Sequence, residues 1–178
     1  MTSNTGRVAG RWAACAVLAL GGVLGGAGQA GAAPASAAAT VNSFSFTSDA
    51  DNPVGNGRTA TLTEPDYEFL SSISDPSDYW LTVYHPDELY SVQFAPPLGE
   101  VLRKGTYKNA VRATWREGWQ PGIDIAGERG CQEKFGSFTV HSIKVNADGR
   151  VTAIDVSFVQ HCWTKDGPLF KGRLTYTE

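Results

Sequence analysis

The residues best suited to bind a ligand lie in one short stretch that ends at Gly122. Trp115 and Trp119 stand four residues apart, and Arg116 and Gln120 follow them directly. Flat aromatic faces can stack on sugar rings or anchor a protein interface, and the polar groups can hydrogen-bond sugar hydroxyls. These four residues predict a binding loop for a polysaccharide or for another extracellular protein. The alternative is that one or both tryptophans cap an open end of the fold, because large aromatic side chains are usually well buried.

The chain holds three histidines, and their spacing does not favour a metal site. His85 precedes a proline in a turn-like sequence, whereas His141 and His161 lie on the two strands of a predicted hairpin. The hairpin turn at 146–149 pairs His141 with about Ile154, well away from His161. We therefore expect no metal and no cofactor, and we expect the histidines to make hydrogen bonds at surface or structural positions.

The sequence shows no motif for catalysis. Residues 136–138 (Gly-Ser-Phe) lack the second glycine of a nucleophile elbow and open a strand rather than a helix. No pair of acidic residues has a spacing that indicates a glycosidase. The acidic loop at 49–52 could suit calcium, but Pro53 and Val54 replace the expected ligand and glycine of an EF-hand, which favours a turn. We predict a non-catalytic binding module, with an unrecognised enzyme and a structural or inhibitory protein as alternatives.

Residues 1–39 have the layout of a secretory signal peptide. Arg7 and Arg11 give a basic start, an apolar run follows at 13–24, and a tract of small residues ends the segment. The apolar run is shorter than the roughly 20 residues of a membrane anchor and is interrupted by glycines. We therefore expect a freely secreted, extracellular protein whose mature chain is residues 40–178. Cleavage near Ala30 is the alternative.

Removal of this segment changes the charge and the cysteine content. The segment contains two arginines and no acidic residue, so the formal net charge goes from −3 to −5. That charge argues against nucleic acid and anionic membranes as partners, because both reward clustered Lys and Arg. Cys15 is also removed, which leaves Cys131 and Cys162. In an oxidising compartment this pair predicts a disulfide, and a two-thiol metal site is the alternative.

Beyond the signal peptide the chain predicts strands and turns, and no segment has convincing helical periodicity. The strongest strand is Val151–Cys162, in which Ile154, Val156 and Phe158 share one face with Cys162. A turn at 146–149 joins it to a strand at 138–145. Further strands are expected at 41–48, 58–63, 67–73, 79–84, 89–95, 105–111, 123–126 and 169–176. Roughly nine or ten short strands predict an all-β fold, a single-domain antiparallel β-sandwich or barrel with one disulfide.

Several short motifs, sharpest from residue 105 onward, resemble those of a known group of proteins. They are Gly105-Thr106-Tyr107, Pro121-Gly122-Ile123, Gly130-Cys131, Gly136-Ser137-Phe138-Thr139-Val140, Phe158-Val159-Gln160-His161-Cys162 and Gly172-x-Leu174-x-Tyr176. This order resembles a group of small secreted bacterial β-rich domains without an assigned biochemical function. The resemblance implies a β-fold over about residues 44–176 and a bridge between the two mature cysteines. It carries no catalytic residues. It departs from the group after Cys162, where such domains tend to have an acidic residue and glycines but this chain has Trp163-Thr164-Lys165-Asp166-Gly167.

Overall fold

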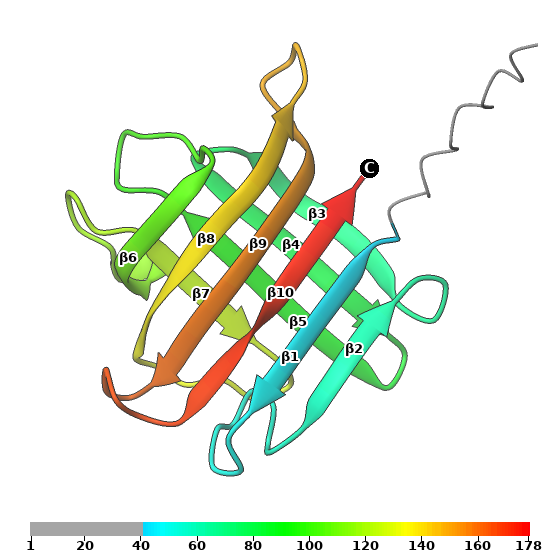
Figure 1. Ribbon diagram of the computed structural model, residues 1–178, viewed down its shortest axis with the longest axis vertical. Helices are drawn as coiled ribbons and strands as arrows, with labels where there is room; N and C mark the ends of the chain where they lie inside the picture. The colour runs from blue at the N-terminus through cyan, green and yellow to red at the C-terminus, as the bar shows by residue number, and fades with distance from the viewer. Residues whose placement is uncertain (1–40) are drawn as a thin grey trace, which may run out of the picture. The chain divides into compact units, whose positions relative to one another are not determined.

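The computed structural model describes residues 41–178, so the expected signal peptide lies outside the described residues (Figure 1). The described part contains ten strands and one short 3-10 helix, η1. They are β1 (Ser43–Ser48), β2 (Thr59–Thr63), β3 (Glu68–Asp75), β4 (Asp78–His85), β5 (Glu88–Ala95), β6 (Gly105–Arg112), η1 (Ala113–Trp115), β7 (Gly122–Ala126), β8 (Lys134–Val145), β9 (Val151–Cys162) and β10 (Leu169–Thr177). Each predicted strand is present, and β9 has the predicted bounds.

Alternation of apolar and polar residues determines which face of each strand is buried. In β9 the side chains of Ile154, Val156 and Phe158 are buried, as the period-2 pattern predicts, and the residues between them are half-buried. In β1 the same alternation buries Phe44 and Phe46. The strands therefore form with one apolar face, and burying that face drives the sheet to curl on itself.

All ten strands belong to one sheet that is nearly closed into a barrel. The strand order is β2-β1-β10-β9-β8-β6-β7-β5-β4-β3, so β2 and β3 are its two edges. In Figure 1, β8, β9, β10, β1 and β2 cross in front of β7, β5, β4 and β3. The prediction of an all-β barrel or sandwich is confirmed.

The sheet is mixed rather than purely antiparallel. Its one parallel pair joins β6 to β7 through Val111↔Gly122 and Arg112↔Ile123. The last two residues of β6 pair with the first two of β7, so the chain leaves the sheet through a connection that begins with η1 and re-enters it in the same direction beside the end of β6. The antiparallel prediction is therefore wrong at this one pair.

Aromatic side chains fill much of the interior. The ring of Phe158 lies 5.9 Å from Phe44, 6.1 Å from Phe94 and 5.7 Å from Phe170, measured between centroids. Such pairs stabilise a core by about 0.5–1.5 kcal/mol each beyond the apolar area that they bury. Phe158 therefore links the front and back strands of the barrel.

Cys131 and Cys162 form the predicted disulfide, with their Cα atoms 5.4 Å apart. The bond ties the loop before β8 to the last residue of β9, and it excludes the two-thiol metal site. Beside it, the side chain of Lys134 is 3% exposed and forms an ion pair with Asp124. Asp124 also accepts a hydrogen bond of 3.2 Å from Nε of Arg112, so one carboxylate neutralises two cations at this end of the barrel.

Candidate functional site

The two tryptophans of the predicted binding loop are both exposed, but they face different surroundings. Trp119 is 71% exposed and lines a groove together with Gln120. Trp115 is 47% exposed and lies outside that groove, with the guanidinium carbon of Arg112 5.0 Å from the centre of its ring. Neither tryptophan caps the interior of the barrel. Of the four residues of the predicted loop, only Trp119 and Gln120 line the groove.

Arg116 holds its own loop in place. Its Nη1 donates a hydrogen bond of 2.8 Å to the carbonyl of Ala113, and its Nη2 lies 3.5 Å from the carbonyl of Ser77. Its stem lies against Gly122, where an added Cβ would meet Arg116 Cδ at 3.2 Å. The guanidinium therefore joins two backbone segments, and Arg116 is not part of the groove lining.

The floor of the groove is a row of partners on the outer face of three neighbouring strands. Val111 of β6 pairs with Phe135 of β8, and Phe135 pairs with His161 of β9. Two strand spacings separate the ends of this row, which makes the floor roughly 10 Å wide. The groove has a volume of about 510 Å³. Loops contribute Trp119, Gln120 and Lys165 to its lining.

A β-bulge directs Asn109 into the same groove. The register between β6 and β8 shifts between Tyr107 and Ala110, and Asn109 has a φ of 56°. Asparagine tolerates this left-handed backbone better than most residues because its short amide can hydrogen-bond locally. Bulges of this kind re-aim a side chain next to a binding surface. The amide of Asn109 therefore adds donors and an acceptor to the lining.

His161 is fixed in one orientation. Its Nδ1 lies 2.7 Å from the carbonyl of Gly167, and because a carbonyl only accepts, Nδ1 is the donor. In the neutral imidazole, Nε2 is then an acceptor. The outward position and hydrogen-bonded role expected for His161 are confirmed, but its place in the groove was not expected.

Sequence reasoning found Trp119 and Gln120 and missed the other polar groups of the groove. Asn109, His161 and Lys165 come from three segments that only the fold brings together. The one available signal was the alternation in β9, which places His161 on the outer face. None of the nine residues that line the groove is acidic. The groove therefore offers aromatic faces and hydrogen-bonding groups for binding, and no carboxylate pair for glycoside hydrolysis.

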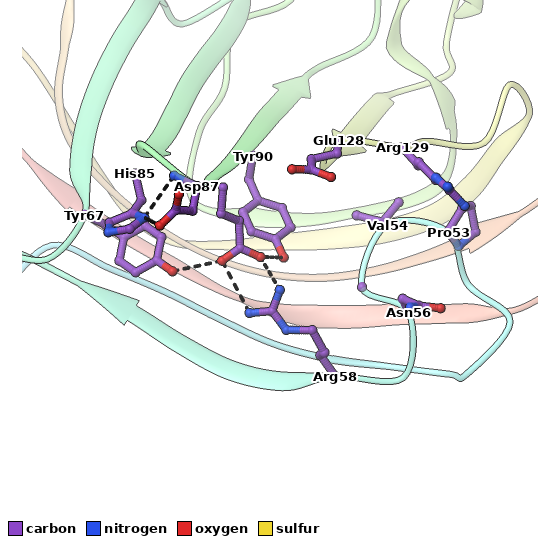
Figure 2. Close-up of a pocket in the computed structure, with 12 residues that line it drawn as sticks. Pro53, Val54, Asn56, Arg58, Tyr67, His85, Asp87, Tyr90, Glu128 and Arg129 are labelled. Atoms are coloured by element: carbon purple, nitrogen blue, oxygen red, sulfur yellow. Dashed lines mark hydrogen bonds and ion pairs between the residues drawn. The ribbon is translucent and has the colours of Figure 1, made fainter.

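A second, larger cavity of about 640 Å³ is shown in Figure 2. In its lining, Glu88 accepts hydrogen bonds from the hydroxyls of Tyr67, at 2.8 Å, and Tyr90, at 2.7 Å. The same carboxylate forms a two-pronged ion pair with Arg58, whose Nη2 lies 3.3 Å away. The network joins the segment before β2, the segment before β3 and the start of β5. It therefore ties the edge-strand segments to the rest of the barrel.

Three donors keep Glu88 ionised although its side chain is 15% exposed. Burial alone would raise the pKa of this carboxyl, but the hydrogen bonds from Arg58, Tyr90 and Tyr67 outweigh it and lower the pKa below its usual range. Burial and the bond to Glu88 raise the pKa of Tyr67 and of Tyr90. Both phenols therefore remain protonated donors, and Glu88 remains a carboxylate.

His85 also lines the second cavity. The backbone N–H of Asp87 donates to Nδ1 of His85 at 3.2 Å, so the neutral imidazole carries its proton on Nε2. The ring of Tyr67 lies 5.2 Å from the imidazole centre. The turn position expected for His85 is confirmed, since it ends β4 at a tight hairpin, but the cavity behind it was not predicted.

His141 and Ser157 form a hydrogen bond on the outer face of the barrel, with 2.8 Å between Nε2 and Oγ. The nearby carboxylate of Asp155 is held by Arg173 in a two-pronged ion pair of 2.7 and 2.6 Å. The bonds from Arg173 lower the pKa of Asp155. His141, Ser157 and Asp155 line none of the five cavities described for residues 41–178.

In the part of the chain that the structure describes, no three or more His, Cys, Asp or Glu side chains are placed to hold a metal ion. Residues 41–178 also contain no helix long and apolar enough to span a membrane. Comparisons of the chain with protein-family models, with curated proteins and with solved structures found no match. The resemblance to secreted bacterial β-rich domains therefore stays a prediction.

Proposed function

We propose that the mature chain is a secreted, non-catalytic module that binds a polysaccharide in the groove around Trp119. The observation that carries the proposal is the 71% exposed indole of Trp119, which lines the same groove as Phe135 and the amides of Asn109 and Gln120. An aromatic face can cover the apolar face of a sugar ring, and amide groups can exchange hydrogen bonds with its hydroxyls.

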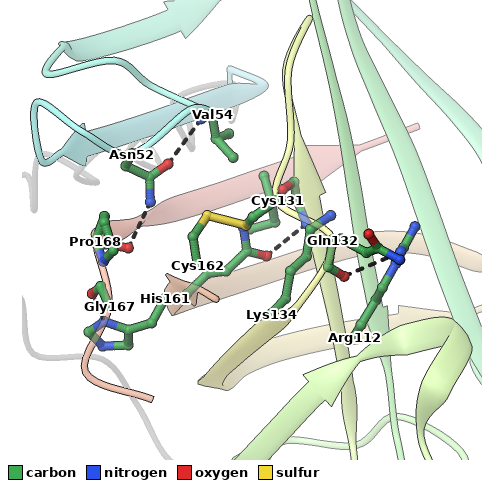
Figure 3. The surroundings of a disulfide bond; sticks show 12 residues. Asn52, Val54, Arg112, Cys131, Gln132, Lys134, His161, Cys162, Gly167 and Pro168 are labelled. Atoms are coloured by element: carbon green, nitrogen blue, oxygen red, sulfur yellow. Dashed lines mark hydrogen bonds between the residues drawn. A yellow bond between two sulfur atoms is a disulfide. The ribbon is translucent and has the colours of Figure 1, made fainter. Parts of the chain in front are cut away.

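The rigidity of the groove supports this proposal. Figure 3 shows His161 next to Cys162, whose disulfide to Cys131 fixes the end of β9, and shows the imidazole turned toward Gly167. Phe135 lies on β8, which pairs with β9 along its length. A groove that is already ordered loses less conformational entropy on binding.

The dimensions of the groove suit a short stretch of a polymer. Its floor spans roughly 10 Å between the ends of the cross-strand row. Its volume of about 510 Å³ lies within the range of small-molecule sites, roughly 300–1,000 Å³.

The proposal is tested by incubating the mature protein with a panel of insoluble polysaccharides and bacterial cell walls, followed by sedimentation. The wild type and Trp115→Ala should sediment with at least one material, and Trp119→Ala should stay in solution. Equal sedimentation of all three proteins would contradict the assignment of the groove. Failure of the wild type to bind any material, together with capture of one extracellular protein, would support the protein-ligand alternative instead.

A further inference from the structure

The large cavity around Glu88 carries charges of both signs on opposite parts of its lining. One part holds the ion pair of Arg58 and Glu88 and, beside His85, the exposed carboxylate of Asp87. The other part holds Glu128 and Arg129, which are adjacent in the loop after β7. Within residues 41–178, Glu128 and Arg129 make no side-chain hydrogen bond or ion pair, and both are exposed. Each of these two side chains is therefore free to bind a charged ligand.

The loop that carries these two charges is packed closely against the cavity wall. The N–H of Gly127 donates to the carbonyl of Arg129 at 3.1 Å, which closes the loop into a turn. A Cβ at Gly127 would meet the carbonyl oxygen of Val54 at 3.0 Å and the Tyr90 ring at 3.2 Å. A side chain at this position would push against both neighbours, so the loop lies close to the cavity wall, with Glu128 and Arg129 beside the cavity (Figure 2).

The wall beneath Arg58 is fixed in the same way. Asn52 is fully buried and donates from Nδ2 to the carbonyl of Pro168 at 2.8 Å, while its Oδ1 accepts from the N–H of Val54 at 3.0 Å. These bonds anchor the loop that leads to Arg58. Each terminal nitrogen of the Arg58 guanidinium carries two hydrogens and gives one bond to Glu88, so donor capacity remains for a ligand.

From this arrangement we propose that the cavity binds a small zwitterion, a free amino acid or a dipeptide. The ligand ammonium is placed toward Glu128, and the ligand carboxylate is placed toward Arg129. A ligand with both charges satisfies both free side chains at once. A simple cation or anion would leave one of them unpaired and would meet a group of its own charge, which weakens its binding. This site is separate from the Trp119 groove, since the two linings share no residue.

The three histidines allow each site to be observed separately in one NMR experiment. His85 lines the zwitterion cavity, His161 lines the Trp119 groove and His141 lies on the outer face away from both. The probes are glycine, glycylglycine, acetate and methylammonium, titrated into the mature protein while the imidazole resonances are recorded. Acetate and methylammonium each carry one of the two charges of glycine.

Glycine or glycylglycine should shift the His85 resonance in a saturable way and leave His141 and His161 unchanged. Acetate and methylammonium should bind about tenfold more weakly or worse. The variants Glu128→Gln and Arg129→Gln should each weaken zwitterion binding about fivefold or more. The matched controls Glu117→Gln and Arg103→Gln, which change exposed charges outside the cavity, should leave it unchanged.

No saturable His85 shift with either zwitterion, up to its solubility limit, would overturn the proposal. Equal affinity for acetate and glycine, or full binding by both Glu128→Gln and Arg129→Gln, would overturn it as well. Saccharide binding in the groove would shift the His161 resonance, and zwitterion binding would shift the His85 resonance. Absence of a His85 shift therefore leaves the proposed function of the groove unaffected, and absence of saccharide binding leaves the zwitterion site unaffected.

Discussion

Gln160 and Ile125 are joined by two hydrogen bonds across the interior of the barrel. The side-chain Nε2 of Gln160 donates to the carbonyl of Ile125, and its Oε1 accepts from the N–H of Ile125, both at 2.9 Å. The parallel pairing of β6 and β7 ends at Ile123, so the backbone of Ile125 has no strand partner on that side. The fully buried amide of Gln160 takes the place of that missing strand.

Replacement of Gln160 by methionine should destabilise the fold strongly. The substitution keeps much of the side-chain volume but leaves a buried N–H and a buried C=O on Ile125 without partners, at about 1–3 kcal/mol each. We expect a loss of roughly 2–6 kcal/mol in the free energy of unfolding, measured by denaturant titration. The control is Gln132→Met, at an exposed position in the same region. Equal stabilities of the two variants would show that the paired bonds contribute little.

The disulfide should also contribute substantially to stability. It closes a loop with a sequence separation of 31 residues. In the chain-entropy account this constraint on the unfolded state stabilises the native state by about 3–4 kcal/mol. The double variant Cys131→Ala/Cys162→Ala should unfold at correspondingly lower denaturant concentration. If its free energy of unfolding falls by less than about 1 kcal/mol, the bond has little role in holding β8 and β9 together.

The carboxylate of Glu88 should make stability fall in acid. Because its pKa is lowered in the folded state, its contribution is complete above the unfolded pKa of about 4.3 and is lost as the pH falls through the lower folded value. We expect wild-type stability to decrease more steeply than that of Glu88→Gln between about pH 5 and pH 3. The control Glu117→Gln should follow the wild-type curve. Parallel curves for wild type and Glu88→Gln would contradict the proposed network.

The expected signal peptide can be tested by the N-terminus of the chain after expression in a bacterial host. If residues 1–39 are a signal peptide, intact mass analysis of protein exported by a bacterial host should give a chain that begins at Thr40. The formal net charge of that chain is −5, since the two arginines of the removed segment are lost. Retention of the full chain in the cell would contradict both the cleavage and the extracellular setting of the proposed function.

The strands could be predicted from the sequence because their alternation is local. Phe44 and Phe46 in β1 and the buried row in β9 are spaced two residues apart, so a short window contains the whole signal. The same alternation places Gln160 among the apolar residues of β9, which marks it as a buried amide that needs partners. Its partner, Ile125, lies 35 residues earlier, and nothing in the local pattern points to it.

The binding surfaces could be predicted only in part, because they depend on contacts between distant segments. Trp119 and Gln120 were found through residue type, but Phe135 and His161 join them only because β8 and β9 pair in one particular register. Arg116 has a residue type suited to binding, yet its guanidinium bonds to nearby backbone carbonyls instead. The Glu88 cavity was missed because its charges come from turns that are separated along the chain.

The affinity of Trp119→Ala for the polysaccharide that the wild type binds, compared with that of Trp115→Ala, tests the central claim most directly. Both changes remove an exposed indole from the same loop, so each variant serves as a control for the loss of one surface aromatic ring in the other. Depletion isotherms should show at least about a tenfold weaker affinity for Trp119→Ala, which corresponds to about 1.4 kcal/mol, and an unchanged affinity for Trp115→Ala. An unchanged affinity for Trp119→Ala, or an equal loss in both variants, would contradict the assignment of the groove as the binding site.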